Sequence, residues 1–111
     1  MSETQENDGL PFGIIDPEYA RAYTLARLTA WQEGYALALH GSFTRDLDLV
    51  AIPWTDHACA PDKLIDHIAY RTGLKIQGAP SVRPFGRLTW TLLFPAGDPR
   101  FVDISVTPKR R

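Results

Sequence analysis

The sequence predicts an α+β domain with two helices and a small mixed or antiparallel sheet of about four to five strands. Two stretches, at about 17–33 and 61–72, repeat apolar residues at the spacing of one helix face, and Gly follows each of them. Other stretches alternate apolar and polar residues, which is typical of strands with one buried face. The predicted order is helix, strand, strand, helix and then further strands, and this order favours an α+β architecture.

The first helix begins at Asp16-Pro17, a capping acid followed by Pro at the first helical position, and Gly34 is the expected stop. Its apolar stripe is expected to form core. The stripe consists of Tyr19, Ala22, Tyr23, Ala26 and Ala30, broadened by Leu25, Leu28 and Trp31.

Two strands are expected next, at Tyr35–Leu39 and Asp46–Ile52. Only a few residues separate them, so an antiparallel hairpin is the economical connection. Alternation in the second strand places its acids on one face and its leucines on the other. The first face carries Asp46, Asp48 and Val50; the second carries Leu47, Leu49 and Ala51.

The second helix begins at Pro61, buries the stripe of Leu64, Ile65, Ile68 and Ala69, and ends at Gly73. A short strand is expected at 74–77, followed by a loop or irregular edge at 78–86, where Pro and Gly recur. Strands at 87–94 and 101–106 then form a second hairpin.

The 111 residues suit one small domain at 10–111, preceded by a loose tail at 1–9. The net charge of -1 gives no general attraction to nucleic acid or to an anionic membrane. Cys59 is the one cysteine, which excludes an internal disulfide and fits a reducing compartment. No stretch approaches the ~18 apolar residues that span a bilayer. A cytoplasmic location is therefore expected.

Asp46 and Asp48 lie on one strand face, roughly 6–7 Å apart at their Cα atoms. Such carboxylates repel each other unless water screens them or a cation such as Mg²⁺ lies between them. Asp103, inside an otherwise apolar strand, would join them if the last strand lies beside the second. Three clustered carboxylates suit metal-dependent phosphoryl or nucleotidyl transfer. The alternative is a solvated strand face that carries acids.

These motifs together resemble the nucleotidyltransferase superfamily, which has the polymerase-beta-like fold. The resemblance rests on Leu39-His40-Gly41-Ser42, on Asp46-Leu47-Asp48-Leu49-Val50 and on Val102-Asp103-Ile104, and it covers roughly residues 17–107. The chain looks most similar to minimal, single-domain members and to small phage-borne proteins.

The resemblance implies Mg²⁺ at the catalytic carboxylates Asp46, Asp48 and Asp103. It implies nucleoside triphosphate at Gly41 and Ser42, where glycine admits phosphates to the backbone and the hydroxyl donates to them. Arg45 resembles the arginine often found shortly after Gly-Ser. The implied activity is transfer of a nucleoside monophosphate to a hydroxyl on protein or RNA.

One spacing departs from the family pattern, because only residues 43–45 separate Ser42 from Asp46, where the pattern usually has about eight or more. This departure favours a second hypothesis, a catalytically inactive domain that binds another protein, such as a phage inhibitor or an antitoxin-like partner. A metal-dependent nuclease is a third hypothesis for the same acids.

Other residues keep more than one interpretation. His40 could contact a phosphate, tune Asp48 or simply end a strand. Arg83 and Arg87 flank a Pro/Gly-rich segment and could reach a phosphate or be ordinary surface charges. Phe85, Trp54 and Trp90 could be core or could line a partner surface.

Overall fold

The computed structural model describes residues 16–41 and 47–108. Within these ranges the chain forms α2 (Pro17–Gln32), β2 (Tyr35–His40), β3 (Leu47–Pro53), α3 (Pro61–Thr72), β4 (Lys75–Val82), a 3-10 turn (Pro84–Gly86), β5 (Leu88–Leu93) and β6 (Phe101–Val106). The predicted α+β class is confirmed. The tail expected at residues 1–9 lies outside the described residues.

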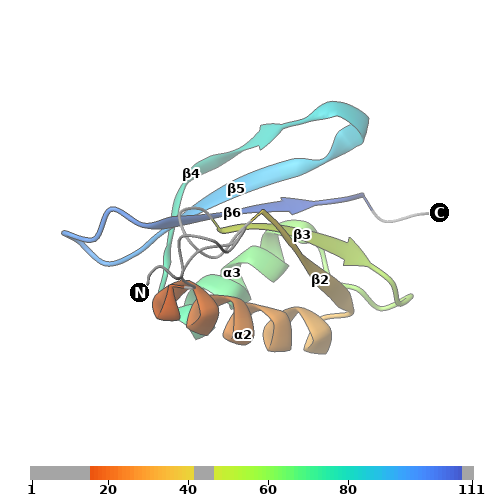
Figure 1. Ribbon diagram of the computed structural model, residues 1–111. Helices are drawn as coiled ribbons and strands as arrows, with labels where there is room; N and C mark the ends of the chain where they lie inside the picture. Colours follow the sequence, from red (N-terminus) through yellow and green to blue (C-terminus); the bar gives the residue numbers. More distant parts are fainter. Residues whose placement is uncertain (1–15, 42–46, 109–111) are drawn as a thin grey trace, which may run out of the picture.

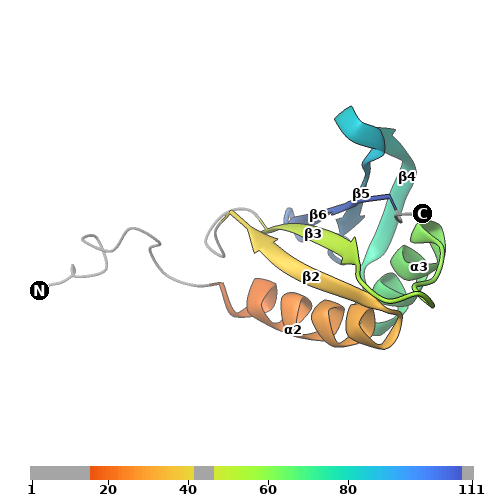
Figure 2. The ribbon, with the colours of Figure 1, turned by 90° about the vertical axis from the view of Figure 1, so that its right-hand side faces the viewer.

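The strands form one mixed sheet in the order β2-β3-β6-β5-β4. The central strands β3 and β6 are parallel, whereas the other neighbours are antiparallel. Both helices cover the same face of this sheet (Figure 1 and Figure 2). Among the described residues no α-helix lies on the opposite face.

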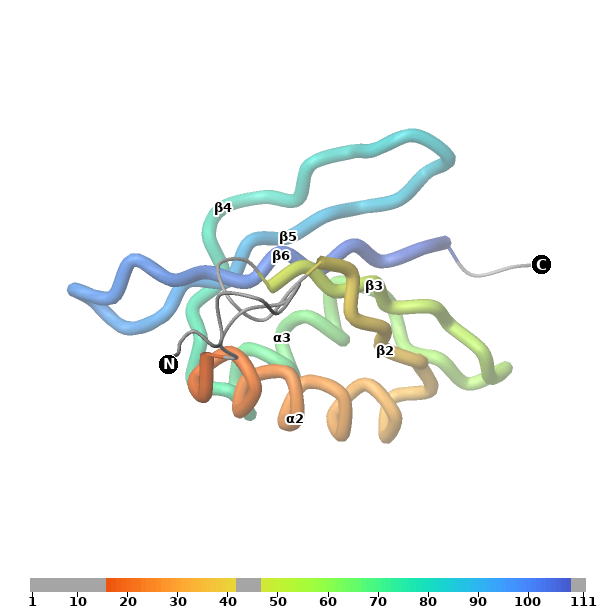
Figure 3. Tube along the Cα trace, in the orientation of Figure 1, coloured from red at the N-terminus to blue at the C-terminus, as the bar shows by residue number. Residues whose placement is uncertain are grey.

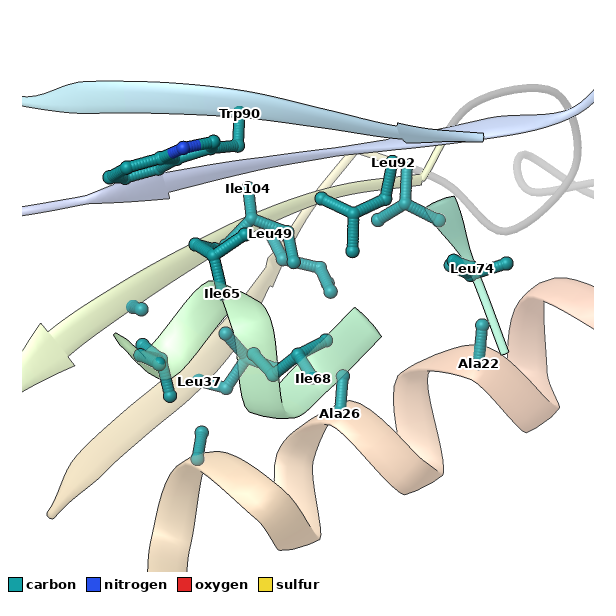
Figure 4. Close-up of a cluster of buried hydrophobic side chains, with 14 of the residues drawn as sticks. Ala22, Ala26, Leu37, Leu49, Ile65, Ile68, Leu74, Trp90, Leu92 and Ile104 are labelled. Carbon is teal, nitrogen blue, oxygen red and sulfur yellow. The ribbon is translucent and has the colours of Figure 1, made fainter. Parts of the chain in front are cut away.

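The core lies between the central strands and the helices (Figure 4). Leu49 of β3 and Ile104 of β6 meet Ile65 and Ile68 of α3, and each of these side chains is at most 1% exposed. Helix α2 presents small side chains to this core, which allows its backbone to come close. These small residues are Ala22, Ala26 and Ala30.

The buried stripe of α2 is narrower than the sequence predicts. The expected core residues Leu28 and Trp31 are 50% and 58% exposed. Trp31 instead contacts the ring of Trp54, which follows β3, with the ring centroids 5.0 Å apart. An amphipathic helix on a sheet buries only the face that the sheet can reach, so residues at the flank of the stripe stay in solvent.

Strand β4 corrects the prediction of a loop at 78–86, because it continues to Val82. The alternative of an irregular edge holds, since its pairing with β5 shifts register between Gln77 and Ser81. Gly78 supplies a positive φ of 62° at this shift. Pro80 is tolerated because β4 is an edge strand. The outer side of an edge strand pairs with no neighbour, so the missing backbone N–H of proline breaks no hydrogen bond there.

None of the helices at 17–32 and 61–72 is long and apolar enough to cross a membrane.

Candidate functional site

The site begins with Asp48 and Asp103, which are directly opposite each other on the parallel strands β3 and β6. Neighbouring parallel strands lie ~4.8 Å apart, so the two carboxylates leave the sheet side by side. Leu49 and Ile104, the residues that follow them, are buried toward the helices. Both acids therefore occupy the opposite face of the sheet, as alternation requires.

The row of side chains continues on both sides of this pair. His40 of β2 lies opposite Asp48, and Thr91 of β5 lies opposite Asp103. The Thr91 Oγ1 hydroxyl donates a hydrogen bond of 2.6 Å to Asp103 Oδ1. This bond engages one carboxylate oxygen and restrains rotation of the Asp103 side chain.

Gly41 follows β2 and lies beside the Asp48 carboxylate. Its φ is +111°, and a Cβ atom added there would lie 3.4 Å from Asp48 Oδ2. A side chain at this position would therefore be strained and would contact the Asp48 carboxylate. Ser42, Arg45 and Asp46, the other predicted site residues, lie outside the described residues.

A hollow of about 340 Å³ opens above the carboxylates. Thr89 and Ser105 line it, and their side-chain oxygens lie 2.8 Å apart. Arg83 and Arg87 line it from the end of the β4–β5 hairpin. The lining of the hollow therefore includes two carboxylates, two hydroxyls and two guanidinium groups.

Both arginines line this hollow, and contact of either one with a phosphate stays a prediction. Thr91 is a site residue that sequence reasoning missed. Its position in an alternating strand places it on the polar face, but its contact with Asp103 depends on the pairing of β5 with β6.

The donor chemistry of the site suits a hard divalent cation. Asp48 and Asp103 offer carboxylate oxygens, which Mg²⁺ prefers and commonly combines with water and substrate phosphates. Residues 16–41 and 47–108 contain no group of three acidic, His or Cys side chains placed to hold a metal ion. Asp46, which the sequence analysis predicts as a further ligand, lies outside the described residues.

Neither a protein-family model nor a curated protein matches the sequence significantly. Among solved structures, the Cid1 poly(U) polymerase with MgGTP bound matches with a TM-score of 0.51 and 18% identity over 84% of this chain. The matched region spans 33% of the polymerase chain. This similarity shows the fold, and the described helices and sheet accordingly have a nucleotidyltransferase-like fold.

Proposed function

We propose that this chain is a metal-dependent nucleotidyltransferase, which moves a nucleoside monophosphate from a nucleoside triphosphate to a hydroxyl. The observation that carries the proposal is the pairing of Asp48 with Asp103 at the base of a hollow of about 340 Å³. Its fold is similar to that of a polymerase solved with MgGTP bound, which supports the same chemistry.

The carboxylates of Asp48 and Asp103 are proposed to hold Mg²⁺, with Asp46 as a further ligand. The ion would supply charge neutralisation of the triphosphate and a lower pKa for the attacking hydroxyl. Gly41 leaves space beside Asp48 for a phosphate to approach the backbone, with Ser42 and Arg45 as proposed phosphate contacts.

In the proposed reaction, the acceptor hydroxyl loses its proton and its oxygen forms a bond to the α-phosphorus. The bond from that phosphorus to the bridging oxygen breaks, and pyrophosphate leaves with the electron pair. Asp103 is proposed to take up the proton, and the hydrogen bond from Thr91, which restrains its carboxylate, supports this role. The hollow positions the two reactants, and such positioning is the main source of rate in phosphoryl transfer.

The test is transfer of label from nucleoside triphosphates labelled at the α-phosphate, with Mg²⁺ and with EDTA. Asp48→Asn and Asp103→Asn are each expected to lower the rate by ~100-fold or more. Asp66→Asn is the matched control, since Asp66 is exposed on α3, in the helical layer that covers the other face of the sheet. Absence of Mg²⁺-dependent triphosphate binding at millimolar concentrations would refute the proposal.

The exposed ring pair of Trp31 and Trp54 favours a second candidate, a domain that binds another protein. Tryptophan is enriched in the energetically dominant part of protein interfaces. Under this candidate, Trp31→Ser would abolish capture of the partner while Asp48→Asn would leave it intact, and no nucleotide would be transferred.

A further inference from the structure

The tip of the β4–β5 hairpin presents an aromatic ring to solvent. Phe85 is 94% exposed, and its φ of +65° is rare for a bulky residue that is not glycine. The Arg83 N–H donates a 2.8 Å hydrogen bond to the Arg87 carbonyl oxygen and closes the tip. The backbone therefore holds the ring away from the core at some conformational cost, which suggests that the exposed position is used.

Two arginines, Arg83 and Arg87, lie two positions before and after Phe85 in the sequence. Arg83 and Arg87 both line the hollow that contains Asp48 and Asp103. In the stretches 16–41 and 47–108, neither guanidinium is ion-paired with a carboxylate. Unpaired arginines beside an exposed aromatic ring form a surface suited to phosphates and planar bases.

The tip and Gly41 lie on opposite sides of the carboxylate pair. Gly41 follows His40, which pairs with Asp48, whereas Leu88 at the tip end of β5 pairs with Val106. Val106 is three residues beyond Asp103, so this pair lies roughly 10 Å further along the strands. Figure 3 shows the tip at the end of the sheet where β6 ends. One substrate can therefore approach from Gly41 and the other from the tip.

We propose that the hairpin tip binds the 3′-terminal part of a single-stranded nucleic acid, which is the acceptor in the transfer reaction. The acceptor role of the strand rests on the proposed function, whereas its binding to the tip does not. Arg83 and Arg87 contact backbone phosphates, Phe85 stacks on a base, and the terminal hydroxyl enters the hollow toward Asp103. Unpaired bases expose the faces that stacking requires, so the surface selects single strands.

Binding is measured by fluorescence anisotropy with a 5′-labelled single-stranded RNA of about 12 nucleotides, without Mg²⁺ or nucleotide. Single-stranded DNA and a blunt RNA duplex of the same sequence are the parallel probes. Arg83→Gln with Arg87→Gln is expected to weaken binding about tenfold or more and to lower the log–log salt slope by ~1.4, because each single-strand phosphate contact contributes ~0.7. Phe85→Leu is expected to weaken binding ~5- to 100-fold.

The matched controls are Arg21→Gln and Tyr70→Leu, which remove an exposed charge and an exposed ring from the helices α2 and α3. Neither is expected to change the affinity by more than about twofold. Phe85 is almost fully exposed, so its replacement leaves the core intact, and circular dichroism checks this.

The inference is overturned if neither single strand binds, if the duplex binds as tightly, or if tip and control variants bind alike. A protein partner that requires Arg83 and Phe85, with no binding of nucleic acid, also overturns it. Asp48→Asn separates the two proposals. If that variant and the unmodified protein both bind RNA but neither transfers nucleotide, the proposed function fails. If transfer to another hydroxyl occurs without strand binding, only the present inference fails.

Discussion

Asp48 and Asp103 are directly opposite each other on parallel strands, and Thr91 holds one oxygen of the Asp103 carboxylate. Like charges in directly opposed positions of a sheet destabilise it by roughly 0.2–1 kcal/mol. A cation or a cationic ligand removes this penalty. Under the proposed function, binding of Mg²⁺ would offset this cost, a trade of stability for activity that is common at functional sites.

Asp103→Asn is accordingly expected to raise the free energy of unfolding by ~0.5 kcal/mol in EDTA, because the repulsion disappears while the side chain still accepts from Thr91. Mg²⁺ with nucleoside triphosphate is expected to raise the melting temperature of the unmodified protein and not that of the variant. Thermal denaturation in both conditions measures this. A variant less stable than the parent in EDTA would show that repulsion is not the dominant effect.

Thr91→Val tests whether the hydrogen bond to Asp103 positions the carboxylate. Transfer is expected to slow about tenfold with little change in the KM for triphosphate, because a freely rotating carboxylate spends less time in the productive orientation. Thr91→Ser retains the hydroxyl and is expected to restore the rate. Equal rates for the valine variant and the parent, with equal folding, would exclude a positioning role.

The sequence predicts each strand of the site but not their mutual register. Alternation in residues 101–106 shows that Asp103 shares a face with Ser105, and this requires only local information. That Asp48 lies beside Asp103 depends on β3 pairing with β6 in parallel, which is a non-local choice. The sequence alone therefore predicts only that Asp103 joins Asp48 if the last strand lies beside the second.

The β4–β5 hairpin shows a second feature that the sequence alone does not predict. Gly78 and Pro80 are typical of a loop, and only the edge position of β4 lets a strand continue through them. The length of this hairpin in turn decides that Arg83 and Arg87 reach the hollow. That they line the hollow could not be predicted without the path of β4.

Gly34 is expected to be intolerant of substitution. Its φ is +89°, and an added Cβ would lie 2.4 Å from Thr55 Oγ1 and 2.7 Å from Ala58 Cα. Gly34→Ala should lower the free energy of unfolding by ~2–4 kcal/mol, since backbone strain and overpacking combine. Gly73→Ala is the control, with a φ of +80° but nothing within 4 Å of its added Cβ. It should cost only ~1–2 kcal/mol. Urea denaturation compares the two variants. Equal losses in the free energy of unfolding would show that backbone strain alone, and not overpacking, causes the destabilisation.

Cys59 is expected to react slowly with alkylating reagents at neutral pH. Burial, followed by the hydrogen bond and negative charge of Glu33, raises the pKa of the Cys59 thiol to about 11. Because only the thiolate reacts, iodoacetamide should label it about a hundredfold more slowly at pH 7.5 than an exposed cysteine. The rate should rise with pH up to about 11. Glu33→Gln should lower this pKa and accelerate labelling. A plateau near pH 8–9, the ordinary range of a cysteine, would contradict the prediction.

Asp16 and Arg100 join the start of α2 to the start of β6. The Asp16 carboxylate caps the helix through the Glu18 N–H at 2.8 Å and accepts from the Arg100 guanidinium at 2.8 and 3.0 Å. Burial alone would raise the pKa of Asp16, but the hydrogen bonds from Glu18 and Arg100 outweigh it and hold this pKa below its ordinary value. The hydrogen bonds from Arg100 likewise lower the pKa of Asp98.

A carboxyl whose pKa is lower in the folded state stabilises the protein above its unfolded pKa of ~3.9, and this contribution disappears as the pH falls through the folded pKa. Asp16→Asn keeps a helix-capping oxygen but loses the charge. The variant should therefore be less stable than the parent at pH 7, and the difference should shrink steadily below pH ~4. Urea denaturation at several pH values measures this gap. Asp62→Asn removes an exposed first-turn acid of α3 and is the control; a loss of stability at pH 7 equal to that of Asp16→Asn would mean that the Arg100 contact adds nothing.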